Sequence, residues 1–118
     1  MMLGIKQYNS YFNFILSYQY NYHHIQLNFK NNNIKDKGVR RLGLALQKCE
    51  NLNTLIIDLR LNNITCAGVA GLIKQLKNFE KVQYLSLNLN QNTILKSQIE
   101  LLAKNIKKMK RLIKLNIF

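Results

Sequence analysis

The side chains that could carry out chemistry are few in this 118-residue chain, and their spacing forms no familiar catalytic pattern. The two histidines, His23 and His24, are adjacent, and no Ser, Cys or carboxylate stands where it would join them in a nucleophile–base arrangement. The chain also lacks a glycine-rich phosphate loop and a Gly-x-Ser-x-Gly sequence. The carboxylates are scattered, at Asp36, Glu50, Asp58, Glu80 and Glu100. We therefore expect no enzymatic activity and no small-molecule substrate.

A metal centre is not expected either. A zinc site needs about four Cys or His ligands at short spacing, whereas Cys49 and Cys66 share no such spacing with the histidines. The sequence therefore predicts no metal ion and no other cofactor. Two reduced thiols indicate a reducing, intracellular compartment. The cytoplasm is the first expectation, and an organellar, ciliary or nuclear assembly is the alternative.

The composition describes one basic globular domain. Hydrophobic residues make up 47% of the chain, and 18 Lys and Arg against 5 Asp and Glu give a formal net charge of +13. No apolar run is long enough to span a membrane, and the first residues lack the pattern of a secretory signal. Such a charge favours anionic partners, such as RNA or an acidic protein surface.

A repeat with a period of 30 residues organises most of the chain. Shifting the sequence by 30 positions aligns apolar residues with apolar residues, and asparagine with asparagine, without a gap. The aligned sets include Ile25, Leu55, Leu85 and Leu115; Asn32, Asn62 and Asn92; and Leu42, Leu72 and Leu102. Internal repeats of this length are typical of proteins in which similar units stack on each other.

Each copy predicts a strand, a turn and a helix. Apolar residues alternate with other residues from Leu55 to Leu59, which is the period of a strand. From Gly68 to Phe79 they recur every three or four positions, which is the period of a helix. Because one such unit cannot bury its apolar side alone, the copies must stack.

This pattern resembles that of the leucine-rich repeat family. The matching residues read Leu52-x-x-Leu55-x-Ile57, Asn62-x-Ile64 and Gly68-x-x-x-Leu72-x-x-x-Leu76. The resemblance is greatest to the long, helix-containing subclass typified by ribonuclease inhibitor. It implies a short α/β solenoid with a curved parallel sheet inside and helices outside. It also implies that Asn32, Asn62 and Asn92 form a ladder that pairs backbone groups of the turns after the strands.

The chain is expected to divide into an N-terminal cap, residues 1–24, and the repeats, residues 25–118. The repeats comprise three full copies and the start of a fourth strand. When the cap is aligned by the same period, Phe12 and Leu16 fall on core positions of the later helices. We therefore expect a helix from Ile5 to Ser17 that packs on the first full repeat.

Two surfaces are candidate binding sites. Residues between the core positions of each strand face the concave side of the sheet, which in the leucine-rich repeat family commonly binds proteins. These residues are Gln26, Asn28, Lys30, Ile56, Asp58, Arg60, Ser86, Asn88 and Asn90. The second surface is a basic stripe on the convex flank and in the loops that lead to the next strand. It consists of Lys74, Lys77, Lys81, Lys104, Lys107, Lys108, Lys110 and Arg111.

The predicted function is a non-catalytic protein–protein interaction module, a subunit or fragment of a larger intracellular assembly. The alternative is a component of a ribonucleoprotein that binds RNA through the basic stripe. The nearby aromatics, Phe79 and Phe118, are expected in the core, so such binding would use phosphates rather than base stacking. A third interpretation is that the stripe docks on an acidic protein surface, and a merely solvated stripe remains the simplest one.

Overall fold

The computed structural model describes residues 5–17, 22–76, 81–109, 111–112 and 114–118, over which strands and helices alternate. The elements are β1 (Ile5–Tyr8), α1 (Tyr11–Ile15), β2 (His24–Asn28), α2 (Lys35–Leu46), β3 (Thr54–Asp58), α3 (Cys66–Leu76), β4 (Tyr84–Asn88), α4 (Lys96–Ile106) and β5 (Lys114–Ile117). All five strands belong to one sheet in chain order, and each neighbouring pair is parallel.

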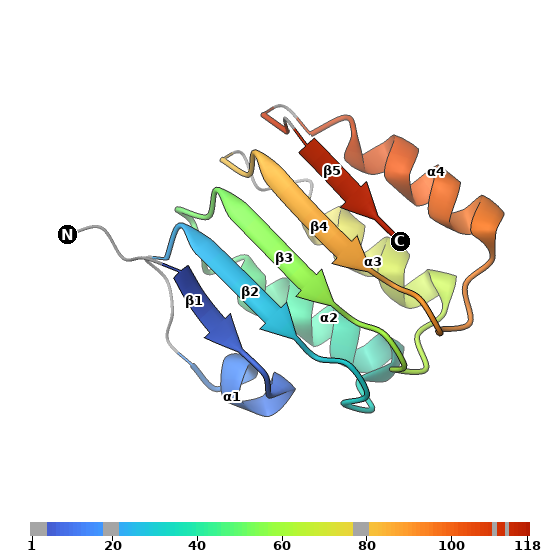
Figure 1. Ribbon diagram of the computed structural model, residues 1–118, viewed down its shortest axis with the longest axis horizontal. Helices are drawn as coiled ribbons and strands as arrows, with labels where there is room; N and C mark the ends of the chain where they lie inside the picture. Colours follow the sequence, from blue (N-terminus) through green and yellow to red (C-terminus); the bar gives the residue numbers. More distant parts are fainter. Residues whose placement is uncertain (1–4, 18–21, 77–80, 110, 113) are drawn as a thin grey trace.

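The described helices lie on one face of the sheet and leave the other face without a helix (Figure 1). Because the strand order follows the chain, β1 forms one edge and β5 the other. These observations confirm the predicted α/β class with a parallel sheet and helices packed on one of its faces. We refer to the opposite surface as the helix-free face.

The register places equivalent residues of the copies side by side. Leu55 pairs with Ile25 on one neighbouring strand and with Leu85 on the other. Paired residues from β2 to β5 are therefore 30 positions apart. Because successive side chains of a strand point to opposite faces, this register aligns every core position of one strand with a core position of the next.

The core lies between the sheet and the helices. Leu55, Ile57 and Leu59, which were predicted to point inward, have at most 1% of their surface exposed. The equivalent residues of the strands on either side, and the apolar stripes of the helices, are buried with them. The fully buried side chains include Ile25, Leu27, Phe29, Leu42, Leu46, Leu72 and Leu85.

Asparagines pair the backbone of the turns that follow the strands. Asn62 is buried completely, and its Nδ2 donates to the carbonyl oxygens of Phe29 at 2.8 Å and Arg60 at 3.0 Å. Asn92 repeats this arrangement one strand further on and donates to the carbonyl of Leu59 at 2.9 Å. Without these amides the turn carbonyls would be buried unpaired. The structure therefore contains the ladder that the resemblance to the leucine-rich repeat family implied for these asparagines.

The N-terminal segment differs from the prediction. Instead of one helix from Ile5 to Ser17, the chain forms the strand β1 and then the short helix α1. β1 pairs with β2, with Ile5 opposite His24, and adds a strand that the alignment did not predict. The sheet therefore begins within the segment that was assigned to a capping helix.

The cause is a shorter spacing between the first two strands. Paired residues of β1 and β2 are 24 − 5 = 19 positions apart, so an alignment by 30 assigns the wrong residues to the core. Tyr11 and Phe14 are buried, whereas Phe12 and Leu16 are 67% and 75% exposed. The prediction that Phe12 and Leu16 pack inward is therefore wrong.

Two aromatic residues near the third copy were also expected in the core. Phe118 is 52% exposed, because it lies 30 positions after Asn88 and so takes a strand position that alternates with the core. Phe79 lies outside the described residues. None of the described helices combines the length and the apolar character that crossing a membrane requires.

Candidate functional site

The helix-free face is built from the strand residues that alternate with the core. Each of β2, β3 and β4 shows the same pattern, in which buried residues alternate with half-buried ones. The register aligns the half-buried residues in rows that cross the sheet. One row contains Gln26, Ile56 and Ser86, and the next contains Asn28, Asp58 and Asn88. The structure therefore brings these six predicted site residues together on one surface.

Asp58 and Arg60 form an ion pair at the end of β3. Arg60 donates to the Asp58 carboxylate from Nη2 at 2.6 Å and from Nε at 3.0 Å, and its backbone N–H donates at 3.1 Å. The hydrogen bonds from Arg60 lower the pKa of the Asp58 carboxyl, and the charge of Lys30 acts in the same direction. The carboxylate in turn raises the pKa of Arg60. A pair this exposed adds little stability, but it holds both charges in a defined orientation.

The polar residues next to this ion pair are oriented by their own hydrogen bonds. Asn88 Oδ1 accepts from the backbone N–H of Asn90 at 3.1 Å, which repeats the contact between Asp58 and the Arg60 backbone. Asn28 Nδ2 donates to Asn9 Oδ1 at 3.0 Å. The exposed Lys30 lies near enough to influence the Asp58 carboxyl. The sheet thus presents a preformed polar row rather than disordered side chains.

The sequence analysis missed a further row at the beginning of the strands. This row contains Thr54, Tyr84 and Lys114, which pair across the sheet. Lys114 Nζ lies 5.6 Å from the centroid of the Tyr84 ring, and Tyr84 Oη accepts from Asn116 Nδ2 at 3.2 Å. This row could have been found from the sequence. The alternation of strand residues has only to be extended by two residues toward the start of each strand, and into the fourth copy, to reach Tyr84 and Lys114.

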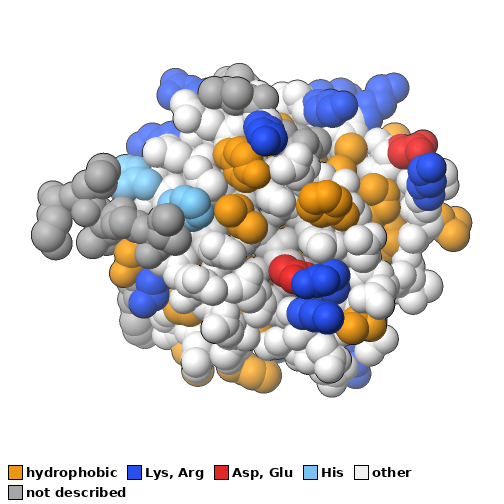
Figure 2. Space-filling model, in the orientation of Figure 1, with side chains coloured by type: hydrophobic (Ala, Val, Ile, Leu, Met, Phe, Trp, Pro, Cys, Tyr) orange, Lys and Arg blue, Asp and Glu red, His pale blue; other side chains and the backbone are white. Residues whose placement is uncertain are grey.

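The basic stripe occupies a different part of the molecule. Its described members are all exposed: Lys74, Lys81, Lys104, Lys107, Lys108 and Arg111. Lys77 and Lys110 lie outside the described residues. Figure 2 shows Lys and Arg side chains along the edge at which the strands begin in Figure 1. The structure does not bring the stripe together with the Asp58–Arg60 pair, which lies at the opposite end of the strand.

Some lysines of the basic stripe lie where they stabilise the fold. Lys74 and Lys104 lie in the last turns of α3 and α4, where the partial negative charge of a helix C-terminus favours cations. Lys81 Nζ donates to Asn51 Oδ1 at 3.1 Å, which links two neighbouring loops. These contacts give the stripe a structural role, whether or not it also binds a partner.

The described residues offer hydrogen bonding and charge pairing. Among them, no group of three or more His, Cys, Asp or Glu side chains could hold a metal ion. The ring nitrogen Nδ1 of His23 lies 3.4 Å from Asn53 Nδ2, so this histidine faces an amide. The helix-free face, with its hydrogen-bonding side chains and its ion pair, is therefore suited to recognising polar groups of another molecule.

Comparison with known proteins relates the chain to others by structure. No protein-family model and no curated protein sequence matches it. Among solved structures, one titled leiomodin-1 actin-binding site 2 is similar, with a TM-score of 0.67 and 15% sequence identity. The similarity covers 96% of this chain and 70% of that one. At this identity the similarity shows the fold alone, and together with the parallel sheet it identifies a leucine-rich-repeat-like fold.

Proposed function

We propose that the chain is a non-catalytic protein–protein interaction module that binds its partner on the helix-free face. In this proposal it is a short leucine-rich repeat solenoid with a 30-residue period, of the helix-containing, ribonuclease-inhibitor-like subclass. Residues 1–24 cap the array and residues 25–118 form the repeats. The module acts as a subunit or fragment of a larger intracellular assembly.

The observation that carries the proposal is the uncovered face of an all-parallel sheet. Such sheets usually have both faces covered by helices. Here one face carries half-buried side chains that cross the sheet in aligned rows. The backbone of this face is already hydrogen-bonded within the sheet. Binding a partner there would cost little conformational entropy, which favours affinity.

The composition of the face also supports a protein partner. Arg and Tyr are enriched at protein interfaces and often dominate the binding energy. Arg60 is held by Asp58, and Tyr84 is held by Asn116. Ile56 lies between them in the middle row and adds an apolar contact. We expect Arg60, Ile56 and Tyr84 to be the main anchors, with Lys30, Asp58 and the polar row around them.

The similar solved structure supports the class of function and not the identity of the partner. Its title names an actin-binding site, so a related arrangement of strands and helices serves there to bind a protein. Because one fold hosts many unrelated functions, actin is not proposed as the partner of this chain.

The second candidate function is RNA binding through the basic stripe. It is favoured by the exposure of all described members of the stripe and by the net charge of +13. In the described part of the chain the ion pair between Asp58 and Arg60 stands alone, so none of the described members of the stripe is paired with a carboxylate. RNA would be held by its phosphates, and its affinity would fall steeply with salt.

The test compares two variants that alter one surface each. The sheet-face variant carries Ile56→Ala and Arg60→Ala, and the stripe variant carries Lys104→Ala and Lys107→Ala. Proteins purified with each tagged variant from the source cells are quantified against the wild type. A partner of the helix-free face should be lost with the sheet-face variant and kept with the stripe variant. Once purified, this partner should bind the sheet-face variant about tenfold more weakly than the wild type, a difference of about 1.4 kcal/mol.

Two other outcomes would contradict the proposal. Equal retention of every protein by both variants would mean that the helix-free face is not the binding surface. Bound proteins or RNA that nuclease treatment releases, and that are lost only with the stripe variant, would support the ribonucleoprotein function instead. Circular dichroism of both variants, which change exposed or half-buried side chains, verifies that each remains folded.

A further inference from the structure

The Asp58 carboxylate occupies only one edge of the Arg60 guanidinium. Arg60 Nε donates to Asp58 Oδ1 at 3.0 Å and Nη2 donates to Oδ2 at 2.6 Å, so both bonds lie on the edge that carries Nε. A guanidinium has five N–H donors in a planar fork. Among the described residues, none accepts a hydrogen bond from Arg60 Nη1. The edge between Nη1 and Nη2 is therefore free to bind a second acceptor.

This free edge is both oriented and accessible. The backbone N–H of Arg60 donates to Asp58 Oδ1 at 3.1 Å, which ties the carboxylate that holds the guanidinium to the main chain. The Arg60 side chain is nevertheless 36% exposed. The planar fork of arginine matches the two oxygens of a carboxylate, and a side chain that is already oriented loses less freedom on binding. Arg60 thus presents a preformed two-donor edge on the helix-free face.

The surroundings of this edge carry one excess positive charge. Asp58 balances Arg60, whereas Lys30 is exposed and forms no ion pair with a described carboxylate. The neighbours of Asp58 in its row, Asn28 and Asn88, are uncharged amides. Figure 2 shows Lys and Arg side chains beside an acidic side chain on this face. One unbalanced cation suits one carboxylate, whereas a phosphate group, with close to two negative charges, would be repelled by Asp58 without being fully balanced.

An apolar side chain lies on the same strand. Ile56 precedes Arg60 by four residues, which corresponds to about 13 Å along an extended chain. It is half-buried and lies between Gln26 and Ser86, so it is the apolar member of the middle row. An extended segment of another protein rises by a similar distance per residue. A carboxylate bound at Arg60 would therefore place over Ile56 the partner residue that is four positions away.

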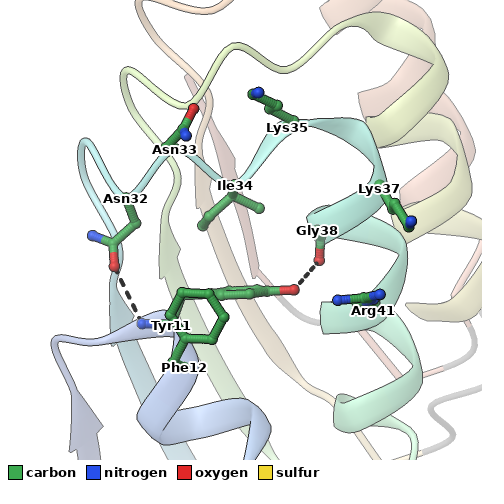
Figure 3. Close-up of a pocket in the computed structure, with 9 residues that line it drawn as sticks. All are labelled: Tyr11, Phe12, Asn32, Asn33, Ile34, Lys35, Lys37, Gly38 and Arg41. Atoms are coloured by element: carbon green, nitrogen blue, oxygen red, sulfur yellow. Dashed lines mark hydrogen bonds between the residues drawn. The ribbon is translucent and has the colours of Figure 1, made fainter.

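The cations beside the pocket between α1 and α2 lack such an arrangement (Figure 3). The residues that line this pocket of about 450 Å³ include Lys35, Lys37 and Arg41. Tyr11 Oη, on its inner wall, donates to the Gly38 carbonyl at 2.8 Å and so belongs to the packing of α1 on α2. None of the three cations is oriented by a side-chain hydrogen bond to a described residue. Arg60 is therefore the cation that the fold prepares for a specific contact.

We propose that the helix-free face binds an extended acidic segment of a partner protein, with one aspartate or glutamate carboxylate on the free edge of Arg60. Lys30 balances the charge of this carboxylate, and an apolar residue four positions away in the segment packs on Ile56. Two parallel N–H···O bonds to a carboxylate give both strength and direction. This inference rests on the function proposed above and adds the chemistry of the partner.

The probes are two short peptides with blocked ends, in which a glutamate stands four positions before or four positions after a leucine and the other residues are serine and threonine. Each is titrated into the isotope-labelled protein to about 5 mM, so that a dissociation constant of about 1 mM can be measured by NMR. The side-chain Nε–H signal of Arg60 and the backbone amide signal of Ile56 should shift with at least one peptide. The same peptide with glutamine in place of glutamate should leave the Arg60 signal unchanged.

Three substitutions separate an oriented fork from general attraction. Arg60→Lys keeps the charge and removes the planar fork, so it should weaken binding of the glutamate peptide about fivefold or more. Lys30→Ala should weaken binding about threefold, because it removes the balancing charge. The matched control Lys104→Ala removes the same charge from an exposed position of α4, where screening by salt should keep its effect below about 1.5-fold. Circular dichroism verifies that each variant is folded.

Several results would overturn the proposal. These are no shift of the Arg60 signal with either glutamate peptide, an unchanged affinity of Arg60→Lys, or equal weakening by Lys30→Ala and Lys104→Ala. Sodium phosphate that displaces the peptide at a lower concentration than sodium acetate, at equal ionic strength, would mean that the site prefers phosphate to a carboxylate.

Failure of this inference and failure of the proposed function can be told apart. If the peptides do not bind at Arg60 but a cellular partner is still lost with the sheet-face variant, the helix-free face binds a protein through other contacts and only the carboxylate site is wrong. If the peptides bind as expected but every cellular protein is retained by the sheet-face variant, the carboxylate site stands and the proposed function is wrong.

Discussion

The Asn62 side-chain oxygen accepts a hydrogen bond from the backbone N–H of Asn32 at 2.9 Å, and Asn92 does the same for Asn62 at 2.9 Å. The same oxygens also accept from Ile34 and Ile64, at 3.2 and 3.1 Å. Each asparagine thus joins its own turn to the turn before it. The Asn62 amide donates two hydrogen bonds and accepts two at once, which a hydroxyl with its single O–H cannot do, and this explains why asparagine recurs every 30 residues.

Replacing Asn62 by alanine should destabilise the chain by about 2–4 kcal/mol. The substitution leaves two backbone N–H groups and two carbonyls without their partner in a site that excludes water, and each buried unpaired group costs about 1–3 kcal/mol before relaxation. Urea unfolding followed by circular dichroism measures the change. Asn90→Ala, which alters an exposed asparagine, should change the free energy of unfolding by less than about 0.5 kcal/mol. Equal effects of the two substitutions would contradict the ladder.

Leu72→Ala tests the core between α3 and the sheet. Leu72 has no exposed surface, so the truncation should lower the free energy of unfolding by about 2–5 kcal/mol. The control is Leu44→Ala in α2, because Leu44 is 54% exposed. Its effect should be within about 0.5 kcal/mol. A Leu72→Ala protein that unfolds at the same urea concentration as the wild type would show that the register is wrong.

Leu61→Asn should stabilise the protein. Leu61 has a left-handed backbone with φ of 57°, and the equivalent residue of the preceding copy is Asn31, also left-handed. This conformation costs most residues about 1–2 kcal/mol, and asparagine tolerates it better. We expect a gain of roughly 0.5–1 kcal/mol, measured by thermal unfolding. Leu61→Ala keeps the Cβ and its steric cost, so a similar gain from alanine would argue against backbone strain as the cause.

The ion pair between Asp58 and Arg60 should make stability depend on pH in the acid range. Because the pKa of Asp58 is lowered in the folded state, its contribution is present above the unfolded value of about 3.9. It is lost as pH falls through the folded value. Asp58→Asn should therefore be less stable than the wild type near neutral pH, with a difference that shrinks in acid.

The experiment for this ion pair is a series of urea unfolding curves from about pH 7 to pH 2, a range that includes the unfolded pKa of a carboxyl. A double-mutant cycle with Arg60→Ala supplies the control. In the Arg60→Ala background the Asp58→Asn substitution should have a smaller effect that varies less with pH. A difference between wild type and Asp58→Asn that stays constant over the series would contradict the role of Arg60.

Much of the fold follows from local patterns. The alternation around Leu55 and Leu85 identifies strands, and their fixed separation identifies which residues face each other across the sheet. The resemblance to the leucine-rich repeat family implies the ladder, and the recurrence of Asn32 and Asn62 at the same separation fits it, because a repeated buried turn needs the same hydrogen-bonding group each time. The rows on the helix-free face follow from the same alternation.

The N-terminal unit shows the limit of this reasoning. A four-residue segment such as Ile5–Tyr8 carries too little pattern to separate strand from helix. Its conformation is decided by pairing with β2, and its offset of 19 positions has no counterpart in the other copies. As a result Tyr11, and not Phe12, is buried against the core.

The recurring spacing was enough to predict the strands from β2 onward, the helices α2, α3 and α4, and the core that they share with the sheet. The resemblance to the leucine-rich repeat family added the asparagine ladder. The first strand, the orientation of Asp58 and Arg60, and the hydrogen bond from Thr65 at the start of α3 to Asp36 follow instead from tertiary contacts. The cationic pocket at α2 does so as well. These features depend on contacts between residues that no local period relates, so they exist only once the units are packed together.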